Sequence, residues 1–315
     1  MHTCLIVVAV CVAAIASICT AAPPESRPLR LIFITCAKDA VFFQPVKKGM
    51  ADAAKAMNVQ CDFTGTEGLD LKAQAEMVRK AVADGYDGIA LNLLDSAAFD
   101  EVVKEAVKKG VPIVAFNVDD RSKPNPRLSG ISQDFVKAGR VVGAEVLNYI
   151  PSGGKVLLTQ HDAGISALDE RLQGIREVLD SKNIPSKVIV SGNDASKAVD
   201  IIARELKADP SIKVILGTGQ ADTEAAGRVI ERDFPNQDYV AAGFDLSPET
   251  LRLIKAGIIK FAIDQQPYAQ GFYPVVQLAL YCRYGIRPAN IDAGATVIHA
   301  ADVDKVIELS RKQYR

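Results

Sequence analysis

The feature that most constrains the fold of this chain is a repeated alternation of short apolar runs with longer segments of helical periodicity. Residues 29–34 form an apolar run that predicts a buried strand, and apolar residues then recur at intervals of three and four. The recurring residues are Phe43, Val46, Met50, Ala53 and Met57. Strands that alternate with helices of this length predict a parallel sheet with right-handed crossovers.

The same alternation runs through the chain twice. In the first half we predict strands at 29–34, 59–63, 89–91 and 112–116, and helices at about 43–57, 71–83 and 98–108. In the second half we predict helices at 135–150, 170–180, 195–207 and 222–233, and strands at 155–158, 188–190, 214–216 and 239–244. The two halves share this pattern without obvious sequence identity, so the repeat is one of architecture.

The length of 315 residues exceeds the usual size of one hydrophobic core, which favours two domains. The elements that remain are strands at 259–263 and 295–298 and helices at 268–283 and 301–312. They are too few for a third domain and must complete the first two. We therefore predict an α/β fold of two doubly wound parallel-sheet lobes joined by a hinge of three crossovers. Lobe one is expected to contain residues 29–131 plus 266–292, and lobe two residues 132–265 plus 293–315.

The first 22 residues differ from the rest of the chain. Residues 4–22 carry no charge and are largely apolar, and small residues close the run before Pro23 and Pro24. This pattern predicts a signal peptide at 1–22 and export to the periplasm. Two alternatives stay open, an uncleaved membrane anchor and a lipid attached to Cys19, although Ile18 stands where a lipidation motif requires a small residue.

Composition excludes several classes of function. The formal net charge of -1 gives no field that would attract nucleic acid. Outside the predicted signal peptide the cysteines are Cys36, Cys61 and Cys282, which we expect to be free, and the histidines are His161 and His299. Their spacing predicts no metal site, and we expect no cofactor. The run 217–222 has aspartate where a dinucleotide-binding loop requires its third glycine.

No catalytic pair is visible in the sequence either. His161, Asp162 and Ser166 are residue types of a catalytic triad. Neighbouring histidine and aspartate side chains are not expected to orient one another as such a relay requires, so we predict that the chain is not an enzyme.

Polar residues gather where the predicted strands end, which is where open parallel sheets bind ligands. These residues are Lys38, Asp39, Asn92, Asp95, Asn117, Asp119, Asp120, His161, Asp162, Gln220, Asp222, Asp245, Asp264, Gln265 and Gln266. Amides and carboxylates suit the hydroxyl groups of a sugar, which both donate and accept hydrogen bonds, and Phe42 or Phe43 could cover an apolar sugar face. The alternatives are that single aspartates cap helices or form turns and that either phenylalanine packs in the core.

Four short segments carry a resemblance to a known family. They are Phe42-Phe43, the run 116–119 (FNVD), the run 243–245 (GFD) and the run 263–268 (IDQQPY), which is followed by Gln270-Gly271. With these segments the chain resembles the periplasmic solute-binding proteins of the ribose-binding type, whose two-lobed core also occurs in lac-repressor-like regulators. The resemblance covers about residues 29–298. The regulators carry a helix-turn-helix before the core, and the segment between Ala22 and Leu29 is too short for one.

The resemblance implies a set of ligand contacts. They are Phe42, Phe43, Asn92, Asn117, Asp222, Asp245 and Gln265, with Lys38 and Asp119 as further candidates. The chain also departs from the pattern, because Asp169 stands where ribose- and glucose-type members carry arginine, and Asn117-Val118 replaces an Asp-Arg pair. Asp169 is therefore a candidate contact to a ligand other than ribose.

The function that the resemblance implies is capture of a sugar or polyol between the lobes and delivery to the permease of an ABC transporter. A monomer is expected. One alternative is a sugar-responsive binding subunit for a chemoreceptor or a sensor kinase, which would use the same closed lobes. Another is a Rossmann-like enzyme that modifies a sugar, which would need a cofactor loop or an acid-base pair.

Overall fold

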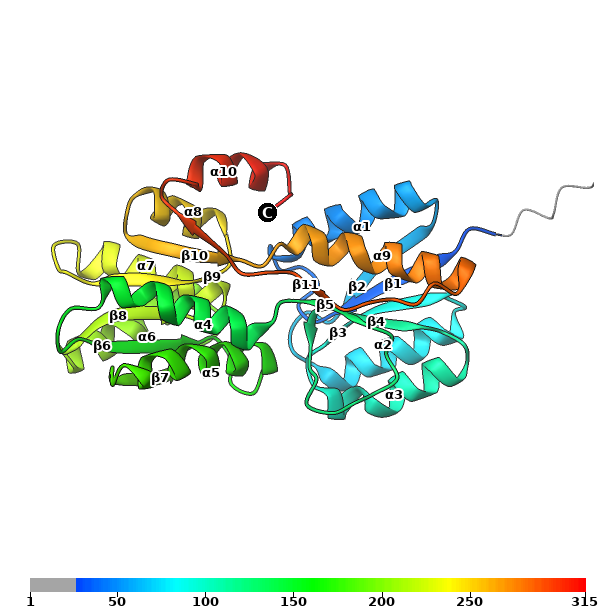
Figure 1. Ribbon diagram of the computed structural model, residues 1–315, viewed down its shortest axis with the longest axis horizontal. Coiled ribbons are helices and arrows are strands. Elements are labelled where there is room, and N and C mark those ends of the chain that lie inside the picture. Colours follow the sequence, from blue (N-terminus) through cyan, green and yellow to red (C-terminus); the bar gives the residue numbers. More distant parts are fainter. Residues whose placement is uncertain (1–26) are drawn as a thin grey trace, which may run out of the picture.

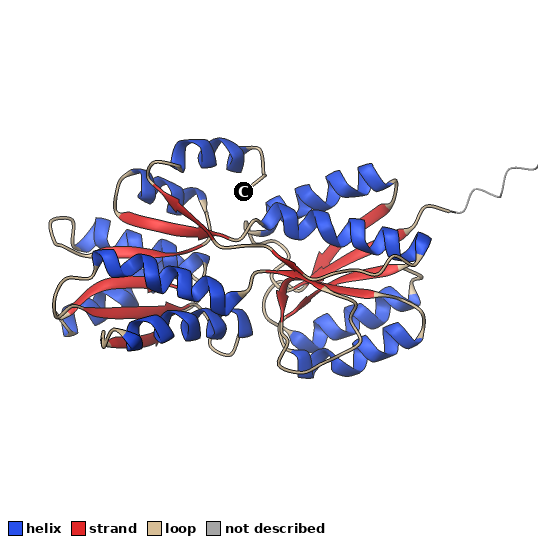
Figure 2. Ribbon diagram, in the orientation of Figure 1, coloured by secondary structure: helices blue, strands red, loops and turns tan. Residues whose placement is uncertain are grey.

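Two six-stranded sheets, each covered by helices on both faces, form the two lobes of the computed structural model, which describes residues 27–315 (Figure 1). The predicted signal peptide lies outside the described residues. Figure 2 shows that helices and strands alternate along both lobes. The predicted fold class is thereby confirmed.

The sheet of lobe one has the order β11-β5-β4-β3-β1-β2, and all of its strands run parallel. The strands are β1 (Arg30–Thr35), β2 (Gln60–Gly65), β3 (Gly88–Leu93), β4 (Ile113–Asp119), β5 (Gly130–Ser132) and β11 (Ile291–Asp292). The helices are α1 (Phe43–Met57), α2 (Leu71–Ala83), α3 (Ser96–Lys108) and α9 (Pro267–Tyr284). Strands β3 and β4 are buried along their whole length, as expected for central strands of a parallel sheet.

The sheet of lobe two has the order β12-β10-β9-β8-β6-β7, with β12 antiparallel to β10. The strands are β6 (Lys155–Gln160), β7 (Ser186–Val190), β8 (Ile212–Gly217), β9 (Val240–Phe244), β10 (Ile259–Asp264) and β12 (Thr296–His299). The helices are α4 (Phe135–Val146), α5 (Ser166–Ser181), α6 (Ala195–Ala208), α7 (Gln220–Asp233), α8 (Pro248–Lys255) and α10 (Val303–Arg311), with a 3₁₀ turn at Leu147–Tyr149.

The chain passes between the two sheets three times, from β5 to α4, from β10 to α9 and from β11 to β12. These passages form the hinge. The residues at which each passage changes lobe stay a prediction. None of the helices within residues 27–315 is long and apolar enough to cross a membrane.

Helix pairs in both lobes approach each other closely at glycines. In lobe one a Cβ atom on Gly271 of α9 would lie 1.9 Å from the carbonyl oxygen of Val46 of α1. In lobe two a Cβ atom on Gly139 of α4 would lie 2.2 Å from the carbonyl oxygen of Arg171 of α5. Each pair therefore packs backbone against backbone, which fixes the helix directions relative to the sheet.

The sequence-based prediction missed three elements. The strands β5 and β11 are only three and two residues long, and the helix α8 covers eight residues between two strands. The two strands are too short to show a periodicity, so they are recognised only once the sheet is known. Helix α8, in contrast, begins with a capping serine, Ser247, followed by Pro248, a start signal that the sequence analysis did not use.

Candidate ligand-binding site

A cleft of about 580 Å³ lies between the lobes and is lined by residues of both. This volume is within the range of small-molecule sites. Five predicted contacts line the cleft: Phe42, Phe43, Asn117, Asp245 and Gln265. They come from the start of α1, from β4 and from the loops directly after β9 and β10. Because parallel strands end at a common edge of the sheet, residues that are far apart in sequence lie at one cavity.

A continuous chain of hydrogen bonds crosses the cleft floor from lobe one through the hinge to lobe two. The Nδ2 of Asn92 donates to Oδ1 of Asn117 at 2.7 Å, and Nδ2 of Asn117 donates to Oε1 of Gln270 at 3.0 Å. The Nε2 of Gln270 donates to the carbonyl of Gln265 at 2.6 Å, and Nε2 of Gln265 donates to Oδ1 of Asp245 at 2.5 Å. Each amide is fixed by its neighbours, so the cleft floor is preorganised.

Backbone geometry also directs this floor into the cleft. Asn117 and Asp245 have positive φ angles of 62° and 72°, and Gln266 has a φ of 51°. The left-handed region is uncommon for residues other than glycine, although asparagine and aspartate tolerate it best. Asn117 and Asp245 line the cleft and Gln266 follows the cleft residue Gln265, which is the kind of local strain that accompanies binding sites.

Phe42 and Phe43 contribute to the cleft in different ways. Phe43 is 4% exposed and packs among the aromatic rings of Phe63 and Phe116 in the core of lobe one. Phe42 is half-buried and meets Phe43 edge to face, with ring centroids 5.2 Å apart. Phe42 therefore has the more accessible face, and Phe43 holds it in place.

The wall formed by lobe two contains a buried arginine that the sequence analysis did not select. Arg171 of α5 donates from Nε and Nη2 to Oε1 of Gln133, at 3.1 and 2.9 Å, and from Nη1 to the carbonyl of Thr218 at 2.7 Å. Its guanidinium carbon lies 4.1 Å from the ring centroid of Phe244. Burial lowers the pKa of Arg171, and the carboxylates of Asp245 and Asp222 oppose that shift. The sequence feature that could have identified Arg171 is a charged residue on the otherwise apolar face of α5.

The neighbouring residues His161 and Asp162 also line the cleft. His161 Nδ1 lies 2.8 Å from Asp162 Oδ2, so the expectation that these side chains do not orient one another was wrong. Residues adjacent in a loop can turn toward each other because the loop backbone is not extended. The hydroxyl of Ser166, however, donates to the carbonyl of Leu94 in lobe one at 3.1 Å, which links the lobes.

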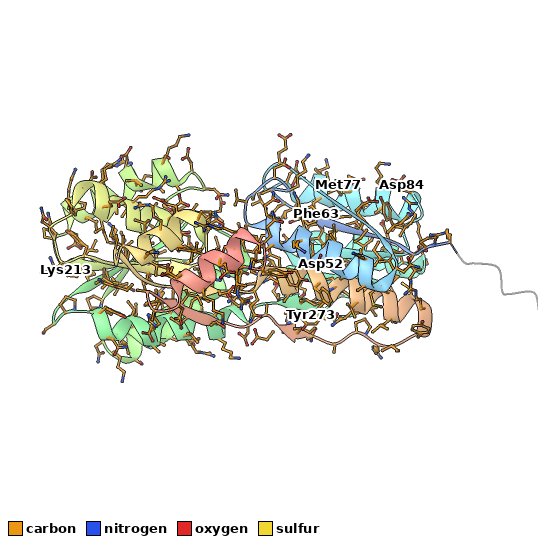
Figure 3. The ribbon with its side chains drawn as sticks, turned by 90° about the horizontal axis from the view of Figure 1, so that it is seen from above. Asp52, Phe63, Met77, Asp84, Lys213 and Tyr273 are labelled. Atoms are coloured by element: carbon orange, nitrogen blue, oxygen red, sulfur yellow. The ribbon has the colours of Figure 1, made fainter. Side chains whose placement is uncertain are left out.

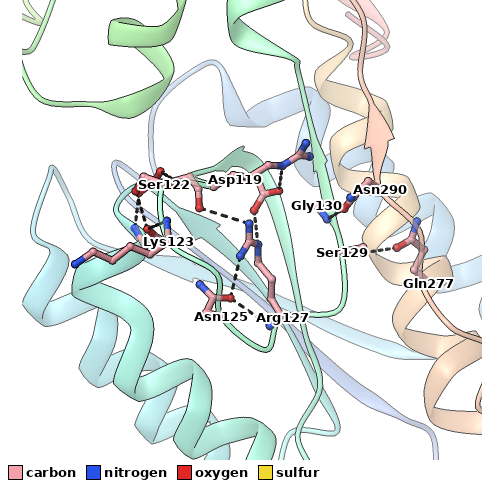
Figure 4. Close-up of polar contacts among 12 residues, drawn as sticks. Asp119, Ser122, Lys123, Asn125, Arg127, Ser129, Gly130, Gln277 and Asn290 are labelled. Carbon is pink, nitrogen blue, oxygen red and sulfur yellow. Dashed lines mark hydrogen bonds and ion pairs between the residues drawn. The ribbon is translucent and has the colours of Figure 1, made fainter.

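Two predicted contacts are engaged with partners inside lobe one and do not line the cleft. The carboxylate of Asp119 is 1% exposed and lies between Arg127 and Arg121, whose Nε is 2.8 Å from Asp119 Oδ2 (Figure 4). Asn92 is fully buried beneath the cleft lining, where it contacts the lining residues Asn117 and Cys36.

Three further predicted contacts also lie away from the cleft lining. Asp222 accepts the backbone N–H groups of Thr218 and Gly219 at 2.6 and 3.0 Å and so caps α7, and burial raises its pKa. Asp169 is exposed and accepts a hydrogen bond from Gln160 Nε2 at 2.7 Å. Lys38 is placed by its backbone, whose N–H donates to the carbonyl of Thr66 at 2.9 Å. In this structure none of the three lines the cleft. Ligand contacts at these residues therefore stay predictions, which would require a different arrangement of the side chains or of the lobes.

A second chamber of about 230 Å³ adjoins the cleft and shares some of its lining. Both cavities are lined by Val41, Phe42, Gln220, Asp245 and Gln265. The far wall of the chamber comes from the end of the described chain: Ser310, Arg311, Gln313 and Arg315.

The chemistry of the cleft is that of hydrogen bonding. Within residues 27–315 no cluster of three histidine, cysteine, aspartate or glutamate side chains is arranged to hold a metal ion. Cys36, Cys61 and Cys282 are free thiols, as predicted, and burial raises the pKa of each. The cleft lining offers amides, carboxylates, the guanidinium of Arg171, the imidazole of His161 and aromatic faces.

Comparison with protein families gives a match over most of the chain. The family model described as "Periplasmic binding protein domain" matches residues 31–285. Among curated proteins, the xylose/arabinose-binding protein XylF of Sulfolobus acidocaldarius is 29% identical over 91% of this chain and 75% of its own length. The D-allose-binding periplasmic protein of Escherichia coli is 26% identical over 72% of this chain and 76% of its own length.

Solved structures agree with this result. A carbohydrate transporter from Acidothermus cellulolyticus, in complex with myo-inositol, superposes with a TM-score of 0.82 at 27% identity, over 91% of this chain and all of that chain. A periplasmic sugar-binding protein of an ABC sugar transporter from Legionella pneumophila gives a TM-score of 0.79 at 25% identity, over 84% of this chain and 99% of that one.

Proposed function

The chain belongs to the periplasmic binding protein family, and we propose that it captures a sugar or sugar-like polyol between its lobes for an ABC transporter. Its relatives are sugar-binding proteins of ABC transporters, not enzymes. The observation that carries the proposal is that one cleft gathers amide and carboxylate groups from both lobes and the hinge, namely Asn117, Asp245 and Gln265.

The proposed mechanism is hinge closure around the ligand. A ligand that bonds to both lobes stabilises the closed form, and a permease can distinguish that form from the open one. Moving the lobes from mostly open to mostly closed requires a preference of about 5 kcal/mol. Several buried hydrogen bonds, at about 1–3 kcal/mol each for charged partners, are sufficient for this.

The relatives indicate the range of ligands to test. Their names give pentoses (xylose and arabinose), a hexose (allose) and a polyol (myo-inositol). We propose that this chain binds a member of the same range. The contacts we assign to that ligand are Phe42, Asn117, Asp245 and Gln265, with Arg171 behind them. If Asp169 turns into the cleft when the lobes close, its replacement of an arginine of the ribose-type pattern would argue against ribose as the preferred ligand.

A ligand screen by thermal unfolding tests this function. Pentoses, hexoses and inositols are added singly to the protein without its first 22 residues, with and without NAD. A ligand at 100 times its Kd is expected to stabilise the fold by about 2.7 kcal/mol. Stabilisation by one sugar alone, without turnover, supports the proposal. Stabilisation only together with NAD, or turnover of the sugar, would instead favour the sugar-modifying enzyme.

Replacing Asp245 with asparagine is expected to weaken binding of that sugar by about tenfold, because a hydrogen bond to a carboxylate is stronger than one to an amide. Asparagine fits the left-handed backbone at this position, whose φ is 72°, so the fold should be unaffected. Titration calorimetry measures the affinity. The matched control is Asp238→Asn, an exposed carboxylate of lobe two outside the cleft. Equal affinities of both variants would remove Asp245 from the site.

Delivery, location and assembly extend this proposal. We propose that residues 1–22 direct export to the periplasm, that the protein acts as a monomer and that it delivers its sugar to a permease. Uptake of the identified sugar into vesicles with the cognate permease tests delivery. A sugar that binds but is not taken up would favour the chemoreceptor or sensor-kinase subunit.

A further inference from the structure

The segment that follows α10 leaves lobe two and ends beside the hinge. Helix α10 is attached to lobe two, where Lys255 of α8 pairs with Asp304 at 2.6 Å. The backbone N–H of Tyr314 then donates to the carbonyl of Leu309 at 2.9 Å, which turns the chain back. Figure 1 shows the end of this segment above the gap between the lobes, near the start of α9.

Tyr314 contacts lobe one at this place. Its ring centroid lies 5.0 Å from that of Tyr268, and Nζ of Lys48 lies 5.3 Å from the ring of Tyr314. The hydroxyl of Tyr268 donates to Asp52 of α1 at 2.8 Å, and Asp52 is labelled in Figure 3. The segment 312–315 is therefore a strap from lobe two to the hinge side of lobe one.

Arg315 reaches a buried carboxylate in the hinge. Its Nε lies 3.2 Å from Oδ2 of Asp264, whose side chain is 2% exposed. The other oxygen of Asp264 accepts the backbone N–H of Gln266 at 2.7 Å. Burial raises the pKa of Asp264 and Asp245 adds to this effect, whereas Arg315 opposes it. A nearby cation favours the charged form of a buried carboxylate, as the hydrogen bond from Gln266 also does.

The carboxylate of Asp264 controls the backbone next to a cleft residue. Gln266 has a φ of 51°, and the hydrogen bond to Asp264 holds this conformation. Gln265 lies between the two and carries the hydrogen bond to Asp245 across the cleft floor. Loss of charge on Asp264 would weaken the bond to Gln266 and so loosen Gln265.

We infer that Arg315 is a positioning residue for the ligand cleft, which acts by keeping Asp264 charged so that the hinge presents Gln265 in its binding orientation. The inference deepens the proposed function, since it rests on Gln265 contacting the ligand. Arg315 also lines the chamber that adjoins the cleft, so the strap and the cleft share one wall.

The experiment compares Arg315→Gln, which removes the charge, with Arg315→Lys, which keeps it. The matched control is Lys312→Gln, because Lys312 carries a positive charge in the same strap but pairs with Glu308 at 2.6 Å on the surface. Calorimetry with the sugar found in the screen should show affinity at least threefold weaker for Arg315→Gln, a smaller loss for Arg315→Lys and none for Lys312→Gln. Amide hydrogen exchange of residues 265–270 without ligand should accelerate at least threefold in Arg315→Gln alone.

The same comparison in an Asp264→Asn background separates positioning through Asp264 from a general effect on the fold. In that background Arg315→Gln should cause no further change in affinity or exchange, because the carboxylate through which it acts is gone. Equal effects of Arg315→Gln in both backgrounds, or an equal effect of Lys312→Gln, would overturn the inference. The exchange measurement needs no sugar, so it decides the role of Arg315 even if the proposed ligand class is wrong.

Discussion

Replacing Arg171 with methionine is expected to lower the free energy of unfolding by about 2–6 kcal/mol, because two buried carbonyl oxygens lose their donor at about 1–3 kcal/mol each. The arginine is 3% exposed, and its side chain supplies two hydrogen bonds to Gln133 and one to Thr218. Methionine fills similar space but leaves both carbonyl oxygens without a donor. It also removes a positive charge that interacts with the carboxylates of Asp245 and Asp222.

Urea unfolding followed by circular dichroism measures this change, and Arg176→Met is the matched control. Arg176 lies on the same helix but is exposed, so its replacement should alter the free energy of unfolding by less than about 0.5 kcal/mol. The same Arg171 variant should bind sugar more than about tenfold more weakly, because Asp245 loses its charged neighbour. A stability equal to that of the control would show that the buried arginine is not needed.

The fold was predictable because its signal is spread over the whole chain. The central strands β3 and β4 are buried at every position, and the helix between them, α3, has one apolar face. A buried strand must therefore be a short apolar run and a covering helix must have apolar residues at helical spacing, and both patterns are visible in the sequence. The short strands β5 and β11 depend on neighbours that are distant in sequence, and no local pattern indicates them.

The cleft was predictable only in part. Strand-end position correctly brought Asn117, Asp245 and Gln265 to one cavity, because parallel strands end at a common edge. The position of a residue at a strand end does not show whether its carboxylate is already bonded to another group of the protein. Asp119 is held by Arg127, and Asp222 caps its own helix three residues after Gly219. Such local partners compete with a ligand for the same oxygen atoms.

Residues that act from helices were missed for a different reason. Gln270 is fully buried on α9, where it connects Asn117 of lobe one to Gln265 of the hinge. Arg171 likewise faces inward from α5. Both interrupt an apolar stripe with a polar side chain, and a search restricted to strand ends does not include them. A polar residue on a buried helix face requires partners, so it is itself a signal.

The second large effect is expected from Gly271→Ala, which should lower the free energy of unfolding by about 3 kcal/mol, at the upper end of overpacking costs. The added Cβ atom would lie 1.9 Å from the carbonyl oxygen of Val46 and 2.7 Å from its carbon, so α1 and α9 must separate. Backbone atoms cannot move aside as a flexible side chain can. Because α9 begins at the hinge residue Pro267, the separation should also weaken sugar binding.

Gly68→Ala is the matched control, since no heavy atom lies within 4 Å of the Cβ position there. Its free energy of unfolding should stay within about 0.5 kcal/mol of the parent protein, as for surface substitutions in general. Urea unfolding of both variants decides the comparison, and calorimetry on the folded Gly271→Ala protein reports the effect on the cleft. If Gly271→Ala is as stable as the control, α1 and α9 do not pack backbone against backbone, and the hinge would need another anchor in lobe one.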